Sequence, residues 1–318
     1  MNKYISNAKD LQTTYEETKL GFMGIALRKS KEASHYVVLG KAFRAVLERY
    51  EDPNDLVNAE NISVGMCDAA GVSTKARGYL NSDDIKVLLA DFIEQYIIPV
   101  GASYVDELIS RYMLTQGDAL GGRMRNIVGG IAAEKLTNNI ISLLNVRGYE
   151  FSYFNKKSKS WIAGGKFSDN ESSSVKAISW KRGDVSRLLY YDLTVPVVKK
   201  NIDIVIFNND DVDNTKTAEF RKFIQNPSNY LALGELKGGI DPAGADEHWK
   251  TANTALNRIR NSFDAAGHHV STLFIGAAIE AAMAEEIYNQ CVEGKMTICA
   301  NLTKDPQFLE LCDWIVTT

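Results

Sequence analysis

The chain has 318 residues, of which 45% are hydrophobic, 9% aromatic and 24% charged, a composition that excludes a disordered, collagen-like or coiled-coil protein. Lysine and arginine number 36 against 40 aspartates and glutamates, and the net charge of -4 argues against indiscriminate polyanion binding but not against a specific nucleic-acid enzyme. No apolar run approaches the ~18 residues of a membrane span, and the first residues lack the apolar core of a signal peptide, so we expect a cytoplasmic protein.

Helical patterns dominate the chain up to about residue 146. In residues 83–100, apolar side chains recur at steps of three and four, Asn81 precedes the pattern as a helix cap, and Pro99 closes it. Two further helices are expected at 104–114 and 126–144. The glycine-rich stretch QGDALGGR between them is expected to form a turn.

The pattern changes after residue 147, where apolar runs predict strands that alternate with helices. The expected strands include YEFSYF, SWIAGG, KAISW, SRLLYYDLTVPVV, IDIVIF, YLALGELK and VSTLFIGAAI, with KRGD as a hairpin turn. Helices are expected at 218–225, 246–266 and 280–292. The sequence therefore predicts a mixed α/β fold with a mainly helical domain at 1–120 and an α/β domain at 121–318.

Three charged residues stand out in two of these strands. Asp203 interrupts the apolar run IDIVIF, where an unpaired charge is costly, so it needs a partner or a cation. Glu235 and Lys237 lie two residues apart in YLALGELK, so their side chains point to the same face of an extended strand. If the two strands are neighbours, the three side chains meet at one edge of the sheet.

Two carboxylates on neighbouring strands suit Mg²⁺, a hard cation that keeps several waters for a substrate phosphate to replace. The ion would lower the pKa of a bound water and stabilise charge on the scissile phosphate. A lysine beside it would orient or deprotonate that water, or neutralise the transition state. This D…ExK arrangement is typical of metal-dependent DNA nucleases, and a structural ion pair between strands is the alternative.

His248 falls in the first turn of the helix predicted at 246–266, near the strand end that carries Glu235 and Lys237. Its neutral imidazole could accept a proton from an attacking water. A histidine that bonds locally at the helix start is the alternative. The apolar stripe of this helix consists of Trp249, Ala252, Leu256, Ile259 and Phe263.

Several longer blocks of sequence carry a family resemblance. They are IDPAGADEHWKTANTALNRIRN (240–261), DLQTTYEE (10–17), VDELISRY (105–112), QGDALGG with MRNI (116–127), KLTNNIIS (135–142), TVPVVKKNIDI (194–204), FIGAAIE (274–280), MAEEI (283–287) and ANLTK (300–304). Together they closely resemble the AvaI/BsoBI family of type II restriction endonucleases. The resemblance covers most of the chain and is weakest in the presumed loops 155–175 and 208–228.

The resemblance implies a PD-(D/E)xK restriction-endonuclease-like core, a mixed β-sheet flanked by helices, plus an N-terminal all-helical domain that helps a homodimer encircle double-stranded DNA. It implies a prokaryotic, Mg²⁺-dependent enzyme, with Mn²⁺ as a substitute, that cuts both strands at the palindromic, degenerate site CYCGRG after the first C and leaves 5′-phosphates. A cognate DNA methyltransferase would be its genetic partner. The superfamily's proline before the first aspartate is absent, because Ile202 precedes Asp203.

By the same resemblance, Asp203 and Glu235 are metal ligands, Lys237 is the catalytic lysine and His248 is a candidate general base. The residues expected to face DNA or to lie at the dimer are Lys200, Asp241, Lys75, Asp118, Arg123 and Arg125. Lysine can donate to guanine O6 and N7, and aspartate can accept from cytosine N4. For Asp241, which precedes a proline, a turn residue is the alternative.

The sequence is also compatible with two other functions. One is a PD-(D/E)xK nuclease with a different DNA target, such as a repair or junction-resolving enzyme, and the other is a non-catalytic DNA-binding protein. The four cysteines have neither CxxC spacing nor a histidine at metal-ligand spacing, so free thiols are expected. The acidic stretch NNDDVDNTK (208–216) lacks the glycine and glutamate of an EF-hand and is interpreted as a solvated loop.

Overall fold

The computed structural model describes residues 1–210 and 217–318, without the side chains of Arg125, Asn126, Asp169 and Thr217. Most of the acidic stretch predicted as a loop, residues 211–216, therefore lies outside the described residues. The chain divides into two compact units: unit 1 is residues 1–22 with 127–318, and unit 2 is residues 23–126. These units differ from the predicted division after residue 120, since residues 1–22 pack with the sheet. Among the described residues, no helix combines the length and apolarity needed to cross a membrane.

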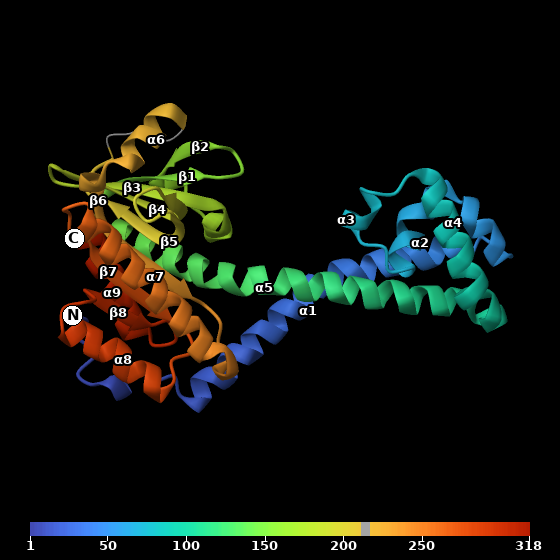
Figure 1. The fold of residues 1–318 in the computed structure, drawn as a ribbon, viewed down its shortest axis with the longest axis horizontal. Helices are drawn as coiled ribbons and strands as arrows, with labels where there is room; N and C mark the ends of the chain where they lie inside the picture. The colour runs from blue at the N-terminus through green and yellow to red at the C-terminus, as the bar shows by residue number, and fades with distance from the viewer. Residues whose placement is uncertain (211–216) are drawn as a thin grey trace. The chain divides into compact units, whose positions relative to one another are not determined.

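Unit 1 is built on a mixed sheet that, over the described residues, has eight strands in the order β2-β1-β3-β4-β5-β6-β7-β8 (Figure 1). The strands are β1 Glu150–Asn155, β2 Ser160–Ala163, β3 Val175–Arg182, β4 Val185–Val195, β5 Lys200–Phe207, β6 Tyr230–Lys237, β7 Ser271–Gly276 and β8 Ile298–Asn301. Neighbours from β2 to β6 are antiparallel, whereas β6, β7 and β8 are parallel. The predicted KRGD hairpin is confirmed: Arg182 pairs with Val185, and Gly183 takes the positive φ that this tight turn needs.

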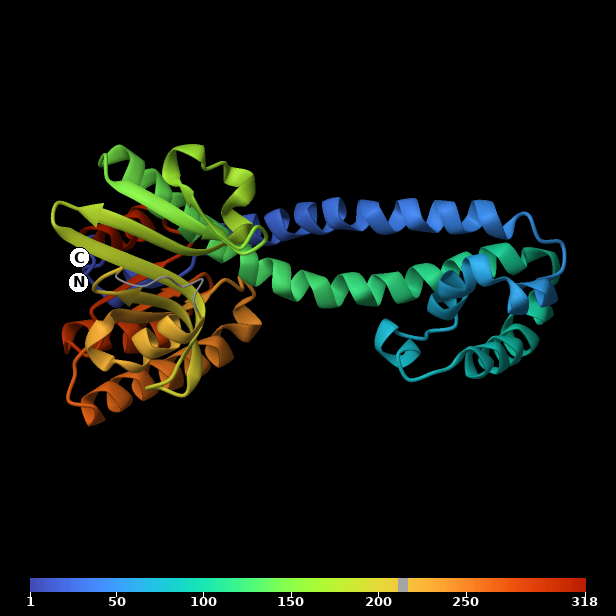
Figure 2. The ribbon, with the colours of Figure 1, turned by 90° about the horizontal axis from the view of Figure 1, so that it is seen from above.

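Helices cover both faces of this sheet (Figure 2). Those of unit 1 are α6 Thr217–Gln225, α7 Ala245–Ala265, α8 Ala281–Val292 and α9 Asp305–Thr317, together with the first residues of α1 Tyr15–Leu47 and the last part of α5 Tyr104–Val146. On one face lies α7. On the other, Thr137 of α5 donates to the hydroxyl of Tyr191 at 3.0 Å, and the indole of Trp180 donates to the carbonyl of Val316 in α9 at 3.2 Å.

The main core lies between α7 and the sheet. The predicted stripe of α7 is confirmed, because Trp249, Ala252, Leu256, Ile259 and Phe263 are all buried. They pack in one cluster with Val205 and Phe207 of β5, Leu233 of β6 and Phe274 of β7. Each large apolar side chain contributes about 1.5–3 kcal/mol on burial, so this cluster fixes where β5 and β6 lie. The predicted mixed α/β class is confirmed.

Unit 2 is helical. Its short helices are α2 Ser63–Ala69, α3 Thr74–Arg77 and α4 Ser82–Phe92. Residues of α2 and α4 pack with α1 and α5 around a second core. The side chain of Asn81 caps α4 as predicted and forms a capping box with Asp84. A π-helical turn at Ile93–Ile97 continues from α4, and a 3₁₀ turn at Ile98–Ser103, which contains Pro99, follows before α5 begins.

The turn predicted at 116–123 is wrong. A single helix, α5, runs from Tyr104 to Val146 through these glycines. A glycine costs a helix only about 1 kcal/mol relative to alanine, and tertiary contacts offset that cost. Here Gln116 donates to Asp68 at 3.0 Å, and Leu120 and Met124 are buried.

Candidate functional site

Asp203 and Glu235 lie at the point where β5 and β6 separate. The two strands pair up to Ile204 opposite Gly234, so Asp203 and Glu235 are the next residues in register. The backbone N–H of Leu236 donates to Oδ2 of Asp203 at 2.9 Å. A side chain of β5 therefore takes the hydrogen bond that a backbone carbonyl would otherwise accept, and this holds the carboxylate against β6.

Lys237 joins the two carboxylates. Its ammonium nitrogen lies 2.6 Å from Oε2 of Glu235 and 3.1 Å from Oδ2 of Asp203. The side chain of Glu235 is only 5% exposed, whereas those of Lys237 and Asp203 are 21% and 28% exposed. The three residues singled out in the sequence thus form one cluster, hereafter the D-E-K cluster, that is buried on the Glu235 side and open on the Asp203 side.

The cluster carries one ammonium group for two carboxylates. Burial and, next, the negative charge of Asp203 raise the pKa of Glu235 to about 7, although the ammonium group of Lys237 lowers it. For Lys237, burial opposes the charged form, but Asp203 and Glu235 outweigh it, so the pKa of the ammonium is raised. Lys237 is therefore protonated, and above about pH 7, where Glu235 is a carboxylate, the cluster retains an excess negative charge that a cation would neutralise.

The donors present fit a divalent metal ion that keeps part of its water shell. Over the described residues, no group of three or more histidines, cysteines, aspartates or glutamates is placed to hold a metal. Two carboxylates are too few for a structural zinc site but match the binding of Mg²⁺, which uses one or two carboxylates with waters and substrate phosphates. Asp203 and Glu235 would be the protein ligands.

His248 lies against the loop that follows Lys237. A Cβ atom added at Gly239 would lie 2.6 Å from Cε1 of His248, and one added at Gly244 would lie 3.6 Å away. The imidazole therefore packs directly on this glycine loop, in the first turns of α7 as predicted. Its place beside the segment that continues from Lys237 suits a group that acts on the same substrate.

Two of the predicted DNA-facing residues lie in unit 1, on either side of the D-E-K cluster in sequence. Lys200 is exposed at the first position of β5, where it pairs with Val195. Asp241 is exposed and its Oδ1 accepts from the N–H of Ala243 at 3.0 Å, so it caps the turn that leads into α7. The turn interpretation of Asp241 is thus confirmed, and it leaves Oδ2 for another partner.

The remaining predicted residues lie in unit 2. Lys75 in α3 and Asp118 in α5 are exposed. Arg123 in α5 is half exposed and forms an ion pair with Glu32 of α1 at 3.3 Å. Arg125 also belongs to α5, but its side chain is outside the described residues.

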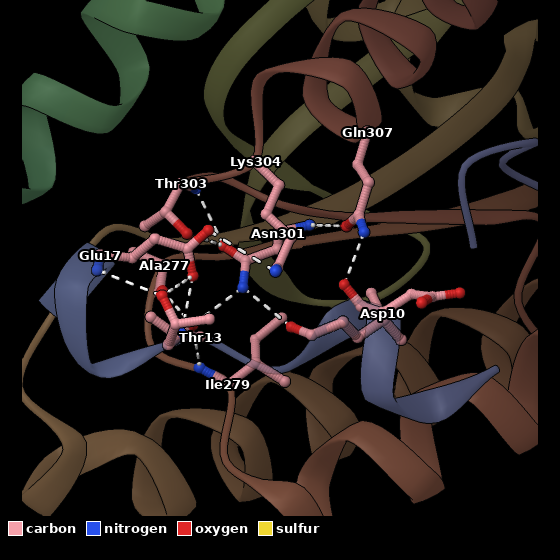
Figure 3. Close-up of polar contacts among 11 residues, drawn as sticks. Asp10, Thr13, Glu17, Ala277, Ile279, Asn301, Thr303, Lys304 and Gln307 are labelled. Carbon is pink, nitrogen blue, oxygen red and sulfur yellow. Dashed lines mark hydrogen bonds and ion pairs between the residues drawn. The ribbon is translucent and has the colours of Figure 1, made fainter. Parts of the chain in front are cut away.

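A polar network that joins residues 10–17 to the segments following β7 and β8 was not predicted (Figure 3). Asn301, at the end of β8, is fully buried, and its amide donates to the carbonyl of Leu11 and the hydroxyl of Thr13, both at 2.8 Å. Gln307 accepts from the N–H of Asn301 at 3.1 Å and donates to the carbonyl of Asp10 at 2.7 Å. Its members lie almost 300 positions apart, so no local pattern could have revealed it.

The comparison with known proteins is consistent along the whole chain. The sequence model of the family described as restriction endonuclease BsobI matches residues 1–318. The type II restriction enzyme BsoBI of Geobacillus stearothermophilus is 45% identical over 316 residues, which cover 98% of this chain and 97% of that protein. The type II restriction enzymes AvaI of Nostoc sp. and of Anabaena variabilis are each 40% identical over 313 residues, 98% of this chain and 98% of theirs.

Proposed function

This chain belongs to the BsobI restriction endonuclease family and is a type II restriction endonuclease, and from that premise we propose that the D-E-K cluster is its catalytic centre for hydrolysis of duplex DNA. The family resemblance of the sequence blocks is confirmed. Enzymes of this type generally use divalent metal ions. The observation that supports the assignment is the convergence of Asp203, Glu235 and Lys237 from two adjacent strands.

We propose Mg²⁺ as the cofactor, with Mn²⁺ as a substitute, held by Asp203 and Glu235. When bound, Mg²⁺ would supply a water of lowered pKa and positive charge at the scissile phosphate. Lys237 lies beside both carboxylates and would place a positive charge next to the phosphate. For the proton of the attacking water we propose the imidazole of His248 as the acceptor, because it packs on the loop that follows Lys237.

The proposed substrate is the palindromic, degenerate site CYCGRG, cut after the first C to leave 5′-phosphates. The support is identity of 40–45% to AvaI and BsoBI over nearly the whole chain. Lys200 would donate to guanine in the major groove, and Asp241 would accept from cytosine N4 through the oxygen that does not cap the turn. Lys75 and Asp118 would face DNA or the dimer from unit 2, and the two arginines Arg123 and Arg125 would bind phosphates.

A palindrome is read most simply by a two-fold symmetric protein, so we propose a homodimer in which each subunit contacts one half-site. The helical residues 1–120 would help the dimer encircle the duplex. The proposed location of the enzyme is the cytoplasm of a prokaryotic cell. A matching DNA methyltransferase would protect the DNA of that cell from cleavage.

Mapping the ends of cleaved plasmid DNA tests this proposal. Incubation with Mg²⁺ should give discrete fragments whose ends share CYCGRG, and ends without a common hexamer would indicate a structure-selective nuclease instead. Glu235→Gln should abolish cleavage. Glu285→Gln, at an exposed position of α8, is the matched control and should cut normally. Cleavage that persists in Glu235→Gln would contradict the assignment of the catalytic centre.

A further inference from the structure

We propose that the start of α1 positions the catalytic segment Lys237–Asp241, and that Thr13 and Gly21 are the positioning residues. The inference rests on the proposed function, because it takes Lys237 as the catalytic lysine and Asp241 as a base-reading residue. It adds two residues that touch neither the metal ligands nor the proposed DNA contacts.

Thr13 anchors the chain just before α1 to the segment that follows β7. Its hydroxyl donates to the carbonyl of Ala277 at 2.7 Å and accepts from the N–H of Ile279 at 3.0 Å. Its backbone N–H donates to the carbonyl of Ile279 at 2.9 Å. Figure 3 shows Thr13 between Ala277, Ile279 and Asn301. The side chain and the backbone of Thr13 thus fix the start of α1 against the residues that follow β7, the strand paired with β6.

Ala277 connects this anchor to the catalytic lysine. Its N–H donates to the carbonyl of Lys237 at 2.9 Å, while its own carbonyl accepts from Thr13. The path from Thr13 to the backbone of Lys237 therefore contains a single residue. Loss of the Thr13 hydroxyl would leave the buried amide of Asn301 and the N–H of Ile279 without this acceptor, so the local structure would have to rearrange.

Gly21 makes the second contact, eight residues further along the chain. A Cβ atom at this position would overlap Cγ1 of Ile240 and lie 3.1 Å from its Cβ. Ile240 is 5% exposed and directly precedes Asp241, so it has little room to move away. A residue without a side chain lets the backbone of α1 approach the loop closely enough to hold Ile240 in place.

The residues between these two contacts are held by other helices. A Cβ atom at Gly238 would lie 2.6 Å from Cβ of Ala132 in α5, and Gly239 packs on His248 of α7. The segment from Lys237 to Asp241 therefore rests on α5, α7 and α1 in turn. Because interiors are close-packed, a displacement of Ile240 is passed along this segment rather than absorbed.

The expected consequence is a coupled change in cutting and base reading. A misplacement of about 1 Å at a reacting group can lower a rate by about a hundredfold. Lys237 and Asp241 lie at the two ends of the same segment, so a shift caused at Ile240 should slow cleavage and weaken discrimination between the cognate duplex and a duplex with one changed base pair.

The first test compares Gly21→Ala with Gly24→Ala, since a Cβ atom at Gly24 would meet nothing within 4 Å and both substitutions favour the helix equally. With Mg²⁺ and saturating cognate duplex, we expect the single-turnover rate to fall at least about tenfold in Gly21→Ala and to stay unchanged in Gly24→Ala. Equal rates for the two folded variants would overturn the role of Gly21.

The second test compares Thr13→Val with Thr13→Ser and is independent of crowding at Gly21. Thr13→Ser keeps the hydroxyl and should retain the wild-type rate, whereas Thr13→Val should slow the single-turnover step about tenfold with a smaller change in duplex affinity measured with Ca²⁺. Equal slowing in both variants, or a change confined to the melting temperature, would overturn the role of Thr13. The cleavage rate of Lys237→Ala is measured in the same series. If Lys237→Ala cleaves at the wild-type rate, the proposed function is wrong. If Lys237→Ala does not cleave but the Thr13 and Gly21 variants cleave at the wild-type rate, only the inference about Thr13 and Gly21 is wrong.

Discussion

The ammonium group of Lys237 lies 2.6 Å from the carboxylate of Glu235, two positions earlier on the same strand, at the place where the neighbouring strand supplies a second carboxylate. Because each group is a counter-charge of the other, replacing one of them changes the energy of the charge that remains.

Replacing Lys237 by methionine should leave two carboxylates with no counter-charge. Removing one partner of a buried ion pair lowers the free energy of unfolding by about 3–5 kcal/mol, and we expect a value near the lower end because the side chain of Lys237 is partly exposed. Urea denaturation at pH 8 without metal measures the loss, and single-turnover cleavage should fall at least about a hundredfold. Lys250→Met, at an exposed lysine of α7, is the control and should change neither; equal behaviour of the two variants would show that the pairing is unimportant.

The raised pKa of Glu235 predicts a pH dependence of metal-free stability. The folded protein binds this proton more tightly than the unfolded chain, whose glutamate titrates near 4.5. The stabilisation is therefore complete below about pH 4.5 and is lost as pH rises through about 7. Denaturation of wild type and Glu235→Gln between pH 5 and 8 measures it, as a difference that should shrink toward low pH. Parallel curves would contradict the prediction.

The same proton should compete with a metal ion. Ca²⁺ affinity should rise as pH increases through about 7, because the cation needs the carboxylate form of Glu235. Calorimetric titrations in buffers of different ionisation enthalpy should detect proton release at pH 6.5 and little at pH 8.5. Glu235→Gln should lose both binding and proton release, and pH-independent affinity of the wild type would contradict the prediction.

Gly234 should not tolerate alanine. An added Cβ atom would lie 2.7 Å from the carbonyl oxygen of Leu273 and would overlap its side chain, so β6 and β7 would have to separate. Overpacking of this kind typically lowers the free energy of unfolding by about 1–3 kcal/mol. We expect a value near the upper end, because the carbonyl oxygen of Leu273 belongs to the backbone and cannot rotate away as a side chain can. Gly130→Ala, in open space within α5, is the matched control and should stabilise unit 1 slightly.

Gly117 and Gly121, in the middle of α5, should each accept alanine. A Cβ atom at either position meets nothing within 4 Å, so the gain in helix propensity of about 0.5–1 kcal/mol should appear as a higher melting temperature. Gly40→Ala, which would place Cβ 2.8 Å from the sulfur of Met113, should not show this gain. A lower melting temperature for Gly117→Ala would indicate that the glycine is kept for a contact outside the single chain.

Much of the site could be predicted because its components are local. The two-residue period of a strand places Glu235 and Lys237 on one face, and the apolar run around Asp203 marks a charge that needs a partner. The stripe of α7, the cap at Asn81 and the hairpin at Gly183 are likewise set by residues within a few positions of each other. The sequence by itself therefore determined where these strands, the hairpin, the helix α7 and the cap of α4 form, and which charged groups they carry.

The tertiary structure decided which of these elements are neighbours. No local sequence pattern predicts that Asp203 lies next to Glu235, that a helix continues through Gly117, or that Asn301 donates a hydrogen bond to Thr13. These outcomes depend on pairing register, on burial that offsets a propensity cost, and on hydrogen bonds between residues nearly 300 positions apart. Such contacts join helices and strands that are far apart in the sequence, so no short stretch of the chain contains both partners and their energies cannot be predicted from local patterns.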